Sequence, residues 1–193
     1  VVAQINGRTY YKSCIVTKPN SGIKTLNDLK GKSFSFVAPT STSGGVAPQY
    51  YLRKNGINPE KHFKSFVWAG KHDSAFLAVK NNKVDAASVA DVYFPRWKER
   101  GILKYSKYDE PKDMMDSPDL RIIGCIKVPG TPVIVRGALG KEMITKITKA
   151  FLTVPVSTVK KYKAYGKTEQ FLPTNHAFYE GLIGMKNLLL HHI

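Results

Sequence analysis

The sequence predicts an α/β fold with a largely parallel sheet. The first observation is the order of the elements, because short apolar runs alternate with helical segments over the first half of the chain. The second is that cap residues separate them, since Thr25 precedes one helical segment and Gly31 and Gly56 each follow one. Alternating strands and helices form parallel sheets, because each helix returns the chain to the edge where the previous strand began.

The first half of the chain carries four strand and helix pairs. Strands are expected where β-branched and aromatic residues gather, at 10–17, 34–37, 63–68 and 84–89. Helices are expected between and after them, at 26–30, 46–55, 70–82 and 91–100. In such sheets, ligands bind beyond the carboxyl ends of the strands.

The composition changes after residue 103. The charged, proline-containing segment 104–119 is expected to be a surface connector. Two strands should follow, at 120–127 and 132–136, with 128–132 as a stiff crossing segment between them. Helices are expected at 141–153, from 155 to about 165, and at 175–190, where apolar residues recur at helical spacing.

The chain is strongly basic. Its 193 residues carry 30 Lys and Arg against 14 Asp and Glu, a formal net charge of +16, and the length suits one or two domains. The basic residues are mostly lysines scattered along the chain, which indicates a solvated surface rather than a nucleic-acid interface. The chain opens at Val1 without an initiator Met, which indicates a fragment or a processed product, and shows neither a secretory leader nor a transmembrane run.

Cysteine and histidine give no metal pattern. Cys14 and Cys125 both lie in apolar, β-branched runs, so buried free thiols are expected, with one disulfide as the alternative if the two strands are neighbours. The pair His191 and His192 is adjacent at the chain end, as in a loose tail rather than a ligand set. We expect no metal and no cofactor.

The segment 39–45 is the strongest candidate for a binding site. Ser41, Thr42 and Ser43 with Gly44 follow a predicted strand and precede a predicted helix. The first N–H groups of a helix lack internal partners, and the helix dipole favours negative charge there, so this turn is suited to an oxyanion. The alternative is an ordinary polar loop with an N-cap. The pattern is neither a P-loop nor a nucleophile elbow.

Two further polar residues follow strands of the same predicted sheet. His72 could donate an N–H to an oxyanion, or it could be a surface residue or helix cap. Asp91 could accept a hydrogen bond from a ligand P–OH or ammonium group, or it could be an N-cap. Serine, histidine and aspartate together also suggest a hydrolase, but no oxyanion-hole motif accompanies the serine, so no catalytic residue is expected.

Several segments in order resemble the phosphate/phosphite/phosphonate-binding proteins of ABC importers. The resemblance rests on the following segments: 26–37, 41–44, 56–60, 70–75, 84–87 and 171–179. It implies a type 2 periplasmic-binding-protein fold, with two α/β lobes joined by hinge strands, incomplete here because the beginning of the first lobe is absent. It implies a crossing strand from the first lobe at 1–20, a second α/β lobe at 21–120, and a second crossing with C-terminal helices returning to the first lobe at 121–193.

The resemblance also implies roles. Ser41, Thr42 and Ser43 match the residues that bind phosphonate oxygens, His72 matches the ligand-binding histidine, and Asp91 matches the acidic acceptor. Tyr11 matches a tyrosine in the family's Tyr-x-Ser crossing strand. An aspartate that the family often carries after the second crossing is replaced by Gly130-Thr131, which argues against an aminoalkyl-phosphonate ligand.

The implied protein is a periplasmic or cell-surface lipoprotein that binds a small anion and delivers it to a membrane permease of an ABC transporter. It is not an enzyme and has no nucleic-acid partner. The alternatives are the ligand-sensing domain of a membrane receptor with the same fold, and a binder of a phosphorylated vitamin.

Overall fold

A computed structural model describes residues 1–161 and 167–190 of the chain. The chain divides into two compact units. The smaller unit comprises Val1–Tyr11 and Pro129–Gly181, and the larger one, here called the sheet unit, comprises Lys12–Val128 and the described residues from Leu182 onward. Assigning these units to the lobes of the resemblance stays a prediction. Among the described residues, no helix is both long and apolar enough to cross a membrane.

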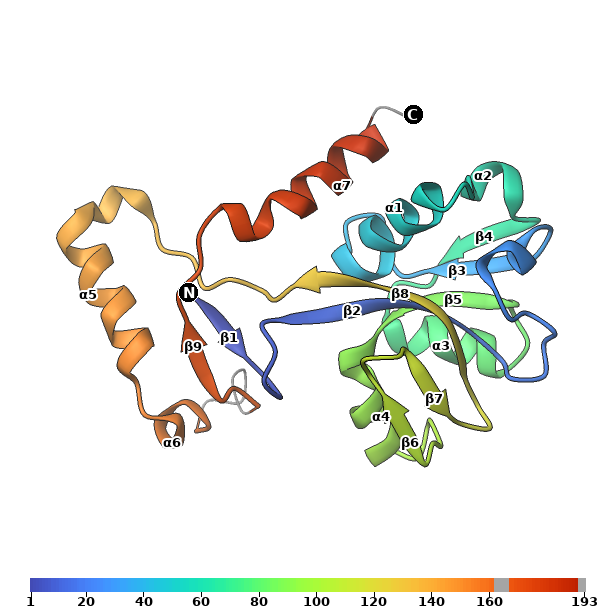
Figure 1. Ribbon diagram of the computed structural model, residues 1–193, viewed down its shortest axis with the longest axis horizontal. Coiled ribbons are helices and arrows are strands. Elements are labelled where there is room, and N and C mark those ends of the chain that lie inside the picture. Colours follow the sequence, from blue (N-terminus) through green and yellow to red (C-terminus); the bar gives the residue numbers. More distant parts are fainter. Residues whose placement is uncertain (162–166, 191–193) are drawn as a thin grey trace. The chain divides into compact units, whose positions relative to one another are not determined.

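The sheet unit is built on five strands (Figure 1). In pairing order they are β4 (Ser65–Trp68), β3 (Ser33–Phe36), β5 (Ala86–Ala90), β2 (Tyr10–Thr17) and β8 (Arg121–Pro129). β3 pairs in parallel with both β4 and β5, which confirms the predicted alternation. β2 instead runs antiparallel to β5, so the sheet is mixed. No single crossover helix joins β2 to β5, because β3 and β4 lie between them in the sequence.

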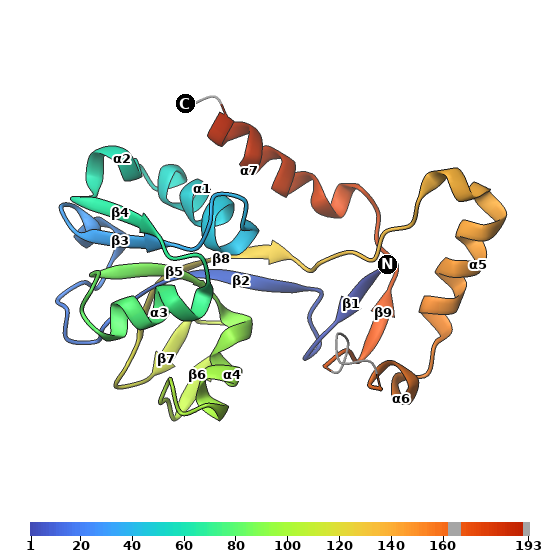
Figure 2. The ribbon, with the colours of Figure 1, turned by 180° about the vertical axis from the view of Figure 1, so that it is seen from behind.

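Helices cover both faces of this sheet, α1 on one side and α3 on the other (Figure 2). Between Lys12 and Val128 the α-helices of the unit are α1 (Ala47–Lys54), α2 (Pro59–His62), α3 (His72–Lys80) and α4 (Phe94–Glu99), with shorter helical turns at Leu26–Leu29, Thr42–Val46 and Asp91–Tyr93. Side chains alternate along β2, so Cys14 and Val16 join the core cluster under α3 and α4, whereas Ile15 joins the cluster under α1. Burial on both faces explains the continuous apolar run of this strand.

The expectation of a plain connector at 104–119 is wrong. This segment contains a hairpin of β6 (Lys107–Asp109) and β7 (Met114–Asp116). Tyr108 and Met115 pair across the two strands and pack against the core cluster under α4. The strands are too short for an alternating pattern to stand out among the charged residues of the turn.

The smaller unit pairs β1 (Val2–Gln4) with β9 (Gln170–Leu172) in an antiparallel ribbon, and it holds α5 (Gly140–Thr153) and α6 (Val156–Val159). The helix predicted at 141–153 is therefore confirmed. The strand predicted at 132–136 is wrong, because only one isolated bridge joins Pro132 to Val2. Proline has no N–H to give to a ladder.

The C-terminal predictions have mixed outcomes. The helix predicted at 175–190 is confirmed as α7 (Glu180–Leu190), preceded by a short 3-10 turn at Ala177–Tyr179. The helix predicted from 155 is confirmed only as α6, and its part at 162–166 lies outside the described residues. The predicted tail at His191 and His192 also lies outside them.

The two cysteines form a disulfide. β2 and β8 are neighbours in the sheet, and Cys14 is bonded to Cys125 across them. The expectation of free thiols is wrong, and the alternative of one bridge is correct. Neighbouring strands bring the two sulfur atoms together, although 111 positions separate the residues in the sequence.

Candidate functional site

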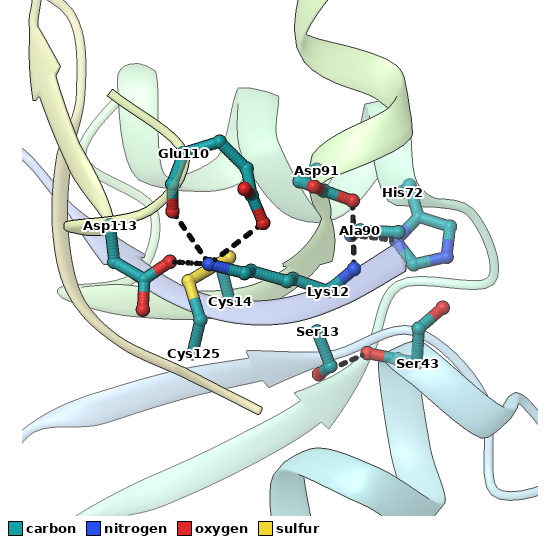
Figure 3. The surroundings of a disulfide bond; sticks show 10 residues. All are labelled: Lys12, Ser13, Cys14, Ser43, His72, Ala90, Asp91, Glu110, Asp113 and Cys125. Atoms are coloured by element: carbon teal, nitrogen blue, oxygen red, sulfur yellow. Dashed lines mark hydrogen bonds and ion pairs between the residues drawn. A yellow bond between two sulfur atoms is a disulfide. The ribbon is translucent and has the colours of Figure 1, made fainter. Parts of the chain in front are cut away.

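Three strands of the sheet unit end at one edge, and a predicted site segment follows each of them. β3 and β4 are in register at Phe36 and Trp68, and β5 ends at Ala90. The segment 41–43 follows β3, His72 follows β4 and Asp91 follows β5. Ser43 and Asp91 bond to Ser13 and Lys12 of β2, and His72 bonds to Ala90, which lies opposite Ser13 (Figure 3). The structure thus brings these predicted residues of the sheet unit together.

The serine-rich segment forms a π-helical turn at Thr42–Val46 that leads into α1. Ser41 is its N-cap, and its hydroxyl accepts the N–H of Gly44 at 3.1 Å. The carbonyl of Ser41 accepts the N–H groups of Gly45 and Val46. Among the described residues, no acceptor binds the N–H groups of Thr42 and Ser43. The turn therefore offers two backbone donors beside two hydroxyls.

Two glycines allow this turn to lie close to the end of β3. A Cβ atom on Gly44 would lie 2.3 Å from Cβ of Val37, and one on Gly45 would lie 2.1 Å from the carbonyl oxygen of Ala38. Neither distance is compatible with a side chain. The glycines are therefore required by the close approach of two backbone segments.

His72 is the first residue of α3 and is partly buried at this edge. Its Nδ1 accepts the N–H of Ala90 at 3.2 Å, and its ring stacks on Tyr93 with centroids 4.6 Å apart. Burial lowers the pKa of His72 from 6.5 to about 4, and the nearby Asp73 carboxylate only partly opposes this. The ring is neutral at physiological pH. Because Nδ1 accepts, the proton resides on Nε2, which can donate to an anion.

Asp91 is buried, with 2% of its surface exposed. Its Oδ1 accepts the backbone N–H of Lys12 at 2.8 Å. It is the first residue of the short helical turn before α4, whose N-cap residue is Ala90. This carboxylate joins the end of β5 to Lys12 of β2 within the sheet unit.

Lys12 is a site neighbour that the sequence reasoning missed. Its side chain is almost fully buried, and Nζ makes ion pairs with Glu110 at 2.9 Å and Asp113 at 2.5 Å (Figure 3). Burial opposes the charge, but the hydrogen bonds to Asp113 and Glu110 and the attraction of both carboxylates outweigh it, so the pKa of Lys12 lies above 10.5. A lysine inside an apolar strand was the only signal for this contact.

Two buried serines were also missed. The hydroxyl of Ser13 on β2 donates to the carbonyl of Ser43 at 2.7 Å, and that of Ser88 on β5 donates to the carbonyl of Gly44 at 3.0 Å. Tyr11, the remaining predicted site residue, belongs to the smaller unit, and its role stays a prediction. Over the described part of the chain, no group of three or more His, Cys, Asp or Glu side chains could hold a metal ion.

Comparison with known proteins decides the family. The model of the family described as "ABC transporter, phosphonate, periplasmic substrate-binding protein" matches residues 1–179. The chain belongs to this family. The match covers both units, which extends the family assignment beyond the sheet unit that carries the serine loop.

Two curated relatives in the phosphonate-binding family are similar to the chain. The phosphonates-binding periplasmic protein of Escherichia coli is 31% identical over 170 residues, covering 86% of this chain and 43% of that protein. The probable ABC transporter phosphite-binding protein PhnD1 of Prochlorococcus marinus is 34% identical over 97 residues, covering 46% of this chain and 32% of that protein. The chain therefore spans less than half the length of these relatives.

Solved structures agree on the fold. A binding protein component of an ABC phosphonate transporter from Pseudomonas aeruginosa matches with a TM-score of 0.69 at 25% identity, covering 96% of this chain and 59% of that protein. The structure of PhnD1 from Prochlorococcus marinus in complex with methylphosphonate matches with a TM-score of 0.71 at 20% identity, covering 98% of this chain and 70% of that protein. The predicted type 2 periplasmic-binding-protein fold is confirmed.

Proposed function

We propose that the full-length protein is the substrate-binding component of an ABC importer and that it captures a phosphorus oxyanion or organophosphonate. The observation that carries this proposal is the pair of unbonded N–H groups on Thr42 and Ser43, beside two hydroxyls, at the carboxyl ends of parallel strands. Membership in the phosphonate-binding family supports the same ligand class.

Each side chain has a distinct role in this proposal. Thr42 and Ser43 bind ligand oxygens through their N–H groups and hydroxyls. His72 donates from Nε2 as a neutral ring, so it adds a hydrogen bond without adding charge. Asp91 accepts a hydrogen bond from a P–OH group of the ligand, which favours a protonated oxyanion over a fully ionised one.

The same family membership supports a proposal for the partner and the compartment. The protein would deliver its ligand to a membrane permease and would work as a binding protein, not as an enzyme. A disulfide between Cys14 and Cys125 suits an oxidising compartment, which supports a periplasmic or cell-surface location, including attachment as a lipoprotein.

Isothermal titration calorimetry of the full-length protein tests the proposal. The ligands are methylphosphonate, phosphite, phosphate and 2-aminoethylphosphonate, and methylsulfonate is the control, because it has the same shape but carries no proton at neutral pH. We expect at least one phosphorus oxyanion to bind and methylsulfonate to bind far more weakly. Gly130-Thr131 predicts no advantage for the amino ligand. Absence of binding to all four phosphorus ligands would contradict the proposed function.

A further inference from the structure

Pro48 leaves two carbonyl groups of the serine turn without their regular helical partners. In an α-helix the carbonyl of Gly44 would accept from residue 48, and in the wider π-helical turn the carbonyl of Ser43 would do the same. Proline has no N–H. The N–H of Ala47, the other regular donor for Ser43, is bonded to Thr42 instead.

Two buried hydroxyls of the sheet donate to these two carbonyls. Ser13 donates to the Ser43 carbonyl, and Ser88 donates to the Gly44 carbonyl, which also accepts the N–H of Val37 at 2.7 Å. Ser13 and Ser88 are 1% and 0% exposed, so water cannot readily substitute for either one. Consecutive carbonyls of the turn are thereby fixed to two neighbouring strands, β2 and β5.

This attachment fixes the direction of the unbonded N–H groups. In a trans peptide the C=O and N–H bonds point in opposite directions. The carbonyls of Ser41 and Thr42 are directed into the turn, where they accept N–H groups of residues 45–47. The N–H groups of Thr42 and Ser43 therefore point the other way, out of the turn. They keep that direction only while the peptides at 43–45 stay in place.

We propose that Ser13 and Ser88 are positioning residues of the oxyanion site, a role that rests on the proposed function of this edge. Their hydroxyls donate to the Ser43 and Gly44 carbonyls, which Pro48 cannot serve, and hold the turn so that the Thr42 and Ser43 donors face the ligand. Neither serine touches the ligand. Both act through the backbone of the turn.

Binding measurements on the full-length protein test the proposal with Ser13→Ala and Ser88→Ala. Each variant should bind methylphosphonate, phosphite or phosphate, whichever the native protein binds, about tenfold more weakly, the loss expected for one buried hydrogen bond. Ser35→Ala is the matched control, because Ser35 is equally buried in the same sheet but donates only to its neighbour Phe36. Ser13→Thr retains the hydroxyl and should restore binding.

Amide hydrogen exchange in the ligand-free protein supplies the second readout. Gly44 and Gly45 donate to Ser41, so their exchange should become about tenfold faster in Ser13→Ala and Ser88→Ala but not in Ser35→Ala. Unchanged exchange at both glycines would overturn the positioning role, whether or not affinity falls. If Ser13→Ala and Ser88→Ala bind with the same affinity as Ser35→Ala, the positioning role is also overturned. A native protein that binds none of the oxyanions would contradict the proposed function, and the exchange rates would still decide what the serines do.

Discussion

His72 shows how its surroundings fix the chemical state of a single residue. Burial holds its pKa at about 4 in the folded protein, against 6.5 for an exposed ring. We expect the NMR signals of the His72 ring to keep their neutral positions from pH 8 down to about pH 5, because the pKa lies below that range. A midpoint near pH 6.5 would contradict this.

The same pKa shift links His72 to stability. The unfolded chain takes up a proton below pH 6.5, whereas the folded ring resists it until about pH 4, so stability is lost as the pH falls through this interval. His72→Gln should remove that part of the pH dependence of unfolding, measured by urea denaturation at pH 7 and pH 4.5. For a partly exposed group the effect should be about 2 kcal/mol.

Asp91 provides a test of ligand selection. Asp91→Asn retains an oxygen that can accept the N–H of Lys12, so the fold should persist. It replaces a carboxylate by an amide that can donate, so the preference for a protonated phosphorus oxyanion over methylsulfonate should shrink by about tenfold or more. Calorimetry with both ligands measures the ratio, and an unchanged ratio would exclude Asp91 from ligand selection.

A substitution at Gly44 tests the close contact between the serine turn and Val37. A methyl group there would overlap Val37, so Gly44→Ala should destabilise the protein by about 2 kcal/mol or more, despite the better helix propensity of alanine. Gly137→Ala is the matched control, because no atom lies within 4 Å of the added carbon. Denaturant midpoints of the two variants make the comparison. Equal midpoints would show that the turn can move away from β3.

At the level of elements, Lys12 joins β2 to the β6–β7 hairpin. Lys12→Met should lower the free energy of unfolding by about 1 to 2 kcal/mol at neutral pH, a moderate value because both carboxylates remain partly exposed. Lys146→Met is the control, since its ion pair with Glu142 is exposed and should contribute little.

The pH dependence of unfolding gives a second measurement of the role of Lys12. Because the pKa of folded Lys12 lies above 10.5, its stabilisation is complete below pH 10.5 and is lost as the pH rises through the folded value. Lys12→Met should remove this alkaline loss. If Lys12→Met loses as much stability at alkaline pH as the native protein does, that loss arises from groups other than Lys12.

The strands and helices around the site could be predicted because their signals are local. Apolar runs and cap residues located β3, β4 and β5, and the strand ends then placed Ser43, His72 and Asp91 at one edge. The contacts of Lys12 could not be predicted, because its partners lie 98 and 101 positions away. Ser13 and Ser88 were missed for the same reason. Each donates to a carbonyl more than 25 positions distant, and a buried serine in a strand has no local pattern.

At the scale of the whole molecule, the disulfide should contribute strongly to stability. The bond between Cys14 and Cys125 closes a long loop, and in the chain-entropy account such a crosslink stabilises by about 4 to 5 kcal/mol. The double variant Cys14→Ala and Cys125→Ala should lose about that amount in urea denaturation. Adding a reductant should destabilise the native protein but leave the variant unchanged. A native protein indifferent to reductant would contradict this.

The position of this bond in the chain has a further consequence. Ser43, His72 and Asp91 all lie between Cys14 and Cys125, so the polypeptide that carries the site is a closed covalent ring. A protease that cuts this ring once, for example in the turn between β6 and β7, produces no separate fragment. The serine turn, the histidine and the aspartate stay on one connected molecule until the sulfur bridge is reduced.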